Sequence, residues 1–119
     1  MASVVDLQIT DSEKDAICVA LPLAEELLFP NPVNASICAM ASKSALAKLN
    51  SRQYKFSMAE IRAISLSVSA AVIICSGQSC EYLDPRLAVS EWKRKLAPHF
   101  FPLNKLEPIL GEFLAGHLH

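Results

Sequence analysis

Glycine and charged residues are scarce in this sequence, and each shortage excludes classes of function. Only three of the 119 residues are glycine. They form neither the glycine-rich loop that binds phosphates nor the glycine–serine elbow of many hydrolases. The chain is 52% hydrophobic and 19% charged, with a formal net charge of -1. Nucleic-acid-binding domains usually carry a clear basic excess, so this balance argues against DNA or RNA as a partner.

The sequence also lacks a recognisable targeting segment and a long apolar run. Its first 15 residues, MASVVDLQITDSEKD, contain no basic region followed by an apolar stretch. The longest nearly apolar stretch, residues 63–75, includes three serines and is shorter than the roughly 20 residues that span a bilayer. We therefore expect a cytoplasmic protein that does not bind membranes, with its four cysteines as reduced thiols.

The length predicts one domain, residues 1–119, with a buried core of its own. Charges are unevenly placed along it. Residues 1–30 contain six carboxylates and one lysine, whereas residues 31–60 contain four cations and one carboxylate. Segments of opposite charge are expected to lie against each other, within one chain or across a dimer.

The first half of the chain predicts an extended arm and two helices. Residues 4–9 alternate weakly between apolar and polar, as a short extended arm would. Thr10 and Glu13 have the spacing of a capping box, in which the two side chains satisfy free backbone amides at a helix start. Pro22 is expected to kink or break the helix that follows. A second, alanine-rich helix is predicted over residues 33–49.

A third helix is predicted to run from the residue after Ser57 to Cys75. Ser57 and Glu60 form a second capping box, and Phe56 is placed to pack on Ile61 as a hydrophobic staple. The helix is apolar on both faces, which is typical of the middle of a bundle or of a subunit interface. The segment ISLSVSA also alternates with the period of a half-buried strand. The capping box and the length favour a helix.

The two capped segments resemble each other at an offset of 47 residues. Thr10, Glu13, Ile17, Leu21 and Ala24 correspond to Ser57, Glu60, Ile64, Val68 and Ala71. This correspondence indicates an internal duplication of a two-helix unit. Capped amphipathic helices also look alike by construction, so both explanations stay open.

A fourth helix is predicted from Asp84 as its cap and Pro85 as its first residue to about Ala97. Val89, Trp92 and Leu96 are expected to face inward.

Pro98 is expected to end this helix. The segment HFFP, residues 99–102, is expected to form a turn whose aromatic rings cover one end of the bundle. Asn104 and Glu107 predict the cap of a short last helix. Residues 115–119 are expected to form a frayed tail. The predicted fold is an all-α compact bundle of four to five helices with the third helix at its centre.

Two thiols bracket the segment CSGQSC, residues 75–80, which looks most like a chemical site. A structural zinc site needs four ligands at short paired spacings, and this pair has no counterpart, so no metal is expected. Cys75 lies at a predicted helix C-terminus, where the dipole disfavours a thiolate. We interpret Cys75 as a core residue and Gly77 as the left-handed residue that ends the helix. A redox switch at Cys75 and Cys80 stays an alternative.

The segment EWKRKL, residues 91–96, is the best candidate for binding nucleic acid. Arg86, Lys93 and Arg94 are the candidate phosphate contacts on a helix over residues 85–97. Consecutive cations point in different directions around a helix, and cations near its C-terminus usually complement the dipole. A regulatory protein that binds nucleic acid therefore stays the other alternative.

The sequence contains no catalytic motif and suggests no cofactor. Its main feature is apolar helix surface in a small domain with few residues to cover it. We expect a non-catalytic helical module that interacts with other proteins and forms a homodimer through apolar helix faces. An enzyme for a small ligand would instead need an apolar pocket with convergent polar groups, which a sequence does not show.

Overall fold

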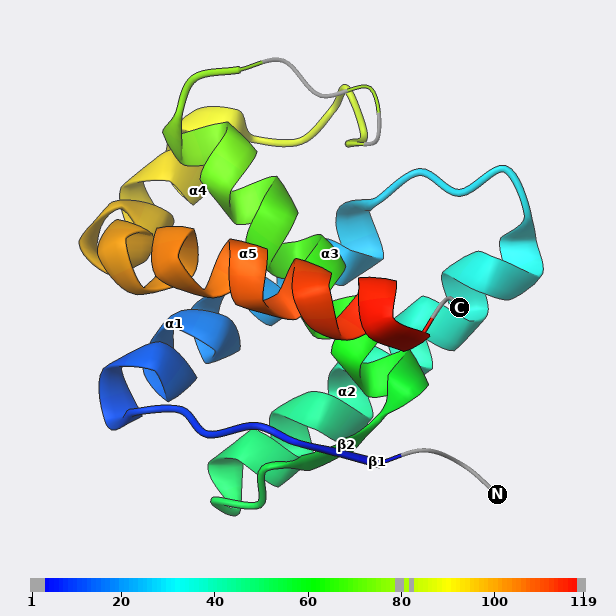
Figure 1. Ribbon diagram of the computed structural model, residues 1–119. Helices are drawn as coiled ribbons and strands as arrows, with labels where there is room; N and C mark the ends of the chain where they lie inside the picture. The colour runs from blue at the N-terminus through cyan, green and yellow to red at the C-terminus, as the bar shows by residue number, and fades with distance from the viewer. Residues whose placement is uncertain (1–3, 79–80, 82, 118–119) are drawn as a thin grey trace.

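Helices form most of the structure, a computed structural model that describes residues 4–78, 81 and 83–117 (Figure 1). The predicted all-α bundle is confirmed, with a two-stranded sheet added to it. In chain order the elements, with η for a 3-10 helix, are β1 (Val4–Asp6), α1 (Asp11–Ala20), η1 (Leu21–Glu26), α2 (Pro32–Asn50), β2 (Lys55–Ser57), α3 (Met58–Cys75), α4 (Val89–Leu96), η2 (Ala97–His99) and α5 (Phe100–His117).

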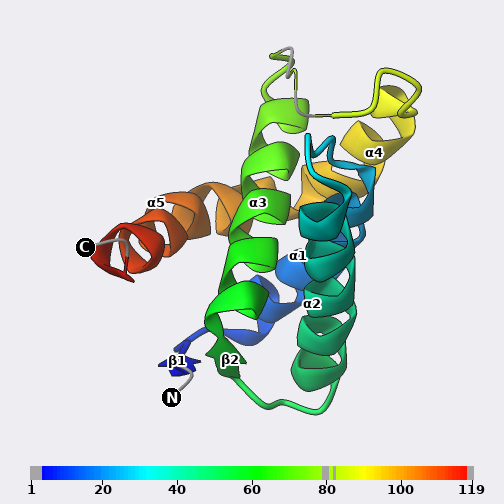
Figure 2. The same ribbon diagram turned by 90° about the vertical axis from the view of Figure 1, so that its right-hand side faces the viewer.

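The third helix of the sequence, α3, is the central element, as predicted. It is in contact with α1, α2, α4, α5 and η1, and Figure 2 shows α2 beside it, α5 across it and α4 near its C-terminal end. Ten of its 18 residues are buried, among them Ile61, Ile64 and Val68. α3 is long and apolar enough to cross a bilayer by length and composition, but more than half of it is buried inside the protein. A core helix has this same composition.

The predicted helix boundaries in the first two thirds of the chain are confirmed. Both capping boxes are closed, at Thr10 for α1 and at Ser57 for α3. The first helix stops before Pro22, and the chain continues as the 3-10 helix η1. Gly77 follows the end of α3 with a φ of 74°, a left-handed conformation that glycine adopts at little cost.

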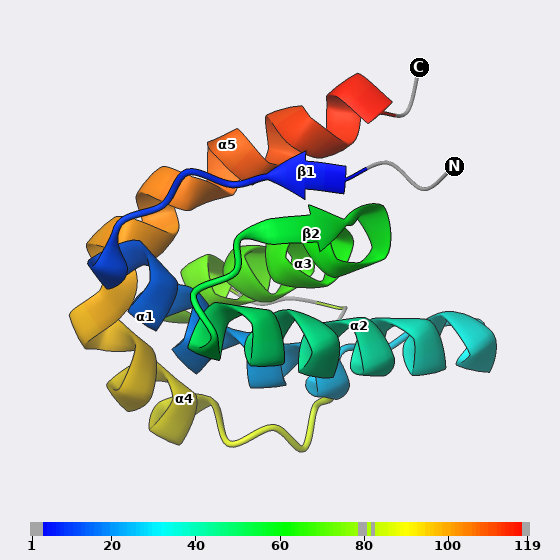
Figure 3. The same ribbon diagram turned by 90° about the horizontal axis from the view of Figure 1, so that it is seen from below.

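The extended arm has a partner that local sequence patterns do not indicate. β1 pairs antiparallel with β2 (Figure 3), and Val5 lies opposite Phe56. Both side chains are buried, so the sheet joins the arm to the start of α3. A short strand therefore precedes each capped helix, but α1 has 10 residues and α3 has 18. The internal duplication stays a prediction.

The predicted start of the fourth helix is wrong, because α4 begins at Val89. Asp84 caps a local turn instead: its Oδ1 accepts a hydrogen bond from the Arg86 amide at 2.9 Å, and its carbonyl accepts one from Leu87. Leu96 is buried as predicted, whereas Val89 is 48% exposed and does not face inward. Trp92 is half-buried.

The predicted turn at residues 99–102 is also wrong, because these residues are helical. Proline is tolerated in the first turn of a helix, where its missing amide has no intrahelical partner, and Pro98 and Pro102 occupy such positions in η2 and α5. Asn104 therefore lies inside α5. Phe101 is 85% exposed, and its ring contacts that of Phe100, with the centroids 6.1 Å apart, instead of covering the core.

The predicted frayed tail at residues 115–119 stays a prediction, and the structure places residues 115–117 at the end of a helix. α5 continues to His117, and residues 118–119 lie outside the described residues. The helix also passes through Pro108.

Candidate functional site

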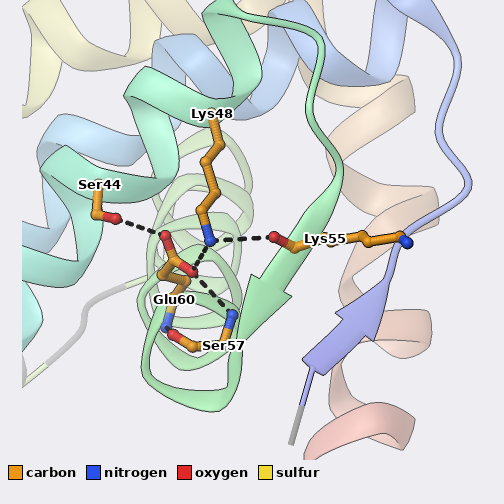
Figure 4. A network of polar contacts seen from close by, with 5 residues as sticks. All are labelled: Ser44, Lys48, Lys55, Ser57 and Glu60. Atoms are coloured by element: carbon orange, nitrogen blue, oxygen red, sulfur yellow. Dashed lines mark hydrogen bonds and ion pairs between the residues drawn. The ribbon is translucent and has the colours of Figure 1, made fainter. Parts of the chain in front are cut away.

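The densest polar cluster surrounds the carboxylate of Glu60, at the start of α3 (Figure 4). The Glu60 side chain is only 5% exposed and forms an ion pair of 2.7 Å with Lys48. Ser44 donates a hydrogen bond to Glu60 Oε2 at 2.7 Å, and the Ser57 amide donates one to Oε1 at 2.8 Å. Lys48 also donates to the carbonyl of Lys55 at 3.1 Å. Donors from α2 and from Ser57, which ends β2 and caps α3, therefore converge on one carboxylate.

This arrangement stabilises the fold and is poorly suited to proton transfer. Burial alone would raise the pKa of Glu60, but the hydrogen bonds from Lys48, Ser57 and Ser44 outweigh burial and lower it. A general acid or base works best with a pKa near the working pH, and this carboxylate is held ionised far from that range. We interpret the cluster as a polar contact that holds α2 against the start of α3. The sequence predicted Glu60 only as a cap, and the structure adds its pairing with Lys48 of α2.

The cysteines of the described residues are poor nucleophiles. Cys18, Cys38 and Cys75 are free thiols there, and burial raises the pKa of each of them. Cys75 packs against the core at the end of α3, as interpreted from the sequence. Cys80 lies outside the described residues. The redox pairing of Cys75 with Cys80 therefore stays a prediction.

We expect the Cys75 thiol to react with an alkylating reagent more slowly in the folded protein than in denaturant, because little thiolate is present and part of the side chain is buried. Timed alkylation with iodoacetamide at neutral pH, followed by peptide mass mapping, follows each cysteine separately. Cys38, which is buried, is the internal reference for slow reaction. Equal rates for Cys75 in the two states would contradict the burial of this thiol.

The predicted phosphate contacts do not share one helix. Lys93 and Arg94 are exposed on α4, but Arg86 precedes the helix. The Arg86 side chain is bound to Asp84 through two hydrogen bonds of 3.1 and 3.0 Å, which lower the pKa of Asp84. Lys95 lies over the Trp92 ring, 5.1 Å from its centroid. The prediction of one helix carrying Arg86 together with Lys93 is wrong.

Uncovered apolar surface is concentrated at the first half of α2. No residue from 32 to 37 is buried, and the first buried residue of α2 is Cys38. Figures 1 and 3 show this half of the helix extending beyond the other elements. Val33, Ile37 and Met40 are 61%, 51% and 72% exposed. We call these three side chains, spaced like one stripe of a helix, the ridge.

Two hollows follow α3, and the first of them adjoins the ridge at Ile37. The first has a volume of about 340 Å³ and lies between α2 and the start of α3, with Ile37, Met58 and Arg62 in its wall. The second, of about 390 Å³, is lined almost entirely by apolar groups of the segment 27–30 and of α3. Phe29 and Leu66 line both hollows, so the hollows lie next to each other, and we call the two together the trough. The ridge and the trough together are the candidate functional site.

The sequence singled out α3, apolar on both faces, for the middle of a bundle or a subunit interface. In the structure η1 and α5 pack on α3, and Ala70 and Ile74 of its second face are buried, so the large exposed apolar side chains lie mainly on α2. Leu66 and Ile73 stay half-buried and line the trough. One signal in the sequence could have indicated α2, because residues 33, 37 and 40 form a stripe separate from the buried one.

Among the described residues, no group of three or more histidine, cysteine, aspartate or glutamate side chains is placed to hold a metal ion. Comparison of the chain with models of protein families, with curated proteins and with solved structures finds no match.

Proposed function

We propose that this protein is a non-catalytic interaction module that works as a homodimer, with the ridge and the trough as its interface. The observation that carries the proposal is the ridge: three large apolar side chains on one side of a projecting helix, each more than half exposed. A contiguous apolar surface beside apolar hollows is typical of a protein–protein contact.

The composition of the site favours an interface over a catalytic pocket. Within the described lining of the second hollow, Ser69 is the only polar side chain, whereas catalytic pockets bring several polar groups together. Charged groups lie at the edge instead: Arg62 is exposed beside the first hollow, and Lys43 pairs with Glu25 at 3.8 Å near the end of the ridge. An apolar centre with a polar rim is the usual composition of a protein interface.

Replacing Ile37 and Met40 together by aspartate should weaken dimerisation by about 100-fold or more, because two charges would be buried in an apolar contact. Sedimentation equilibrium over the micromolar range measures the dissociation constant. Both side chains are exposed in the single chain, so the thermal stability of the monomer should change little.

The matched control is Phe101→Asp, which places the same charge on a large exposed apolar residue of α5. This variant should dimerise like the unmodified protein. A strict monomer of the unmodified chain at high micromolar concentration would refute the proposal, and equal weakening by the control would place the interface elsewhere.

A further inference from the structure

Within the residues that the structure describes, the ridge is left largely uncovered, because its three side chains are 51% to 72% exposed. Cys38, Ala41 and Ala45 of the same helix are buried against the body of the protein, and Ile37 lies between this buried stripe and the first hollow. A second molecule that packs on this side of α2 would cover the ridge.

The trough is suited to receive a helix with such a stripe. It runs beside α3 from Met58 to Ile73, and helices bind in apolar grooves through side chains at positions i, i+4 and i+7. The ridge has this spacing: Ile37 follows Val33 by four residues, and Met40 follows it by seven. The chain therefore contains both a groove and a matching helix.

We infer that the two copies of the homodimer exchange these elements: the ridge of each copy inserts into the trough of the other. The inference rests on the proposed homodimer and adds the arrangement of its interface. A two-fold interface brings the same surface of both copies together, so that surface must be complementary to itself. A ridge next to a trough meets this requirement, whereas two ridges alone would leave both troughs empty.

The charges around the site favour a second copy over a strongly charged partner. Glu25 and Lys43 lie at the same rim, and their side chains are 47% and 77% exposed. Arg62 is exposed at the first hollow. Glu25 and Lys43 already pair with each other, so they offer little charge to any partner, and a strongly charged partner gains little attraction at this surface.

The arrangement predicts specific contacts that photo-crosslinking can map. We would replace Met40 by p-benzoylphenylalanine and mix ¹⁴N-labelled and ¹⁵N-labelled protein, so that mass spectrometry separates crosslinks between copies from those within one copy. The expected crosslinks run between copies and end at the partner's Leu66, the partner's Ser69 or the partner's Ile73.

Other crosslinking results would separate a failure of the exchange from a failure of the homodimer. Crosslinks between the ridges of the two copies would overturn the exchange and leave the homodimer intact. Crosslinks within one copy only, from a protein that still sediments as a dimer, would also overturn it. A protein that is monomeric throughout would refute the proposed function itself.

Filling the trough provides a second test that leaves the ridge unchanged. Ser69 is half-buried in the lining of the trough, and Ser69→Trp should weaken dimerisation by at least about tenfold, because the ring occupies the space that the ridge needs. Arg94→Trp, on exposed α4, is the control and should have no effect. Circular dichroism of both variants checks that the monomer folds. An unchanged dissociation constant for a folded Ser69→Trp protein would overturn the exchange.

Discussion

Replacing Phe56 by alanine is expected to lower the free energy of unfolding by about 3 to 5 kcal/mol, the usual loss for a large aromatic residue in a core. The Phe56 side chain is fully buried. It belongs to β2, which pairs with β1, and Lys48 lies 5.9 Å from the centroid of its ring. The substitution therefore leaves a cavity where the sheet meets the start of α3. Urea denaturation followed by circular dichroism measures the loss.

The matched control deletes the same group of atoms at a largely exposed position. Phe101 is 85% exposed on α5, so Phe101→Ala should change the free energy of unfolding by less than about 0.5 kcal/mol. Similar losses for Phe56→Ala and Phe101→Ala would contradict the arrangement of the core around β2.

Replacing Glu60 by alanine is expected to lower the free energy of unfolding by about 2 to 4 kcal/mol, because the cap of α3 and the partner of Lys48 are lost together. Glu60→Gln separates the two effects. Glutamine can still close a capping box, so this variant loses mainly the charge and should be destabilised by about 1 to 2 kcal/mol. Urea denaturation at neutral pH compares the three proteins.

The stabilisation by Glu60 should also depend on pH. Its pKa is lower in the folded protein than the ordinary value of 4.5. The ionised carboxylate therefore stabilises the fold at pH values above 4.5, and this contribution is lost as the pH falls through the lower folded pKa. The difference in unfolding free energy between the unmodified protein and Glu60→Gln should be constant near neutrality and shrink in acid. A difference that grows in acid would contradict the lowered pKa.

A double-mutant cycle checks that Lys48 is the partner. Lys48→Met leaves the buried carboxylate without its cation and should destabilise the protein, whereas Lys48→Met combined with Glu60→Gln should lose less than the sum of the two single changes. Strict additivity would show that Lys48 and Glu60 are not coupled across α2 and α3.

Local interactions made several helix boundaries predictable. Thr10 with Glu13, and Ser57 with Glu60, are capping boxes because residues three apart meet at any helix start. Pro22 and Gly77 act through their own backbone geometry, so the break after α1 and the end of α3 followed from these residues alone. The central position of α3 followed from apolar residues on both of its faces.

The same local rules failed where two local structures compete. Asp84 and Pro85 suit a helix start and a turn equally, and the hydrogen bonds of Asp84 to Arg86 close the turn. Pro98 and Pro102 suit a helix start as well as a helix end, and here they lie in the first turns of η2 and α5. The choice between such alternatives depends on packing against the rest of the chain.

The candidate site shows the same division between local pattern and tertiary structure. The sequence by itself determined that α2 has apolar residues at 33, 37 and 40 and that Glu60 caps α3, because both depend on spacing along a single helix. Only the tertiary structure decided that η1 and α5 pack on α3 while the ridge of α2 stays uncovered. It also decided that Lys48 turns to Glu60 and that β1 pairs with β2. These contacts join residues far apart in the chain, and which apolar surfaces bury one another depends on the geometry of the whole fold.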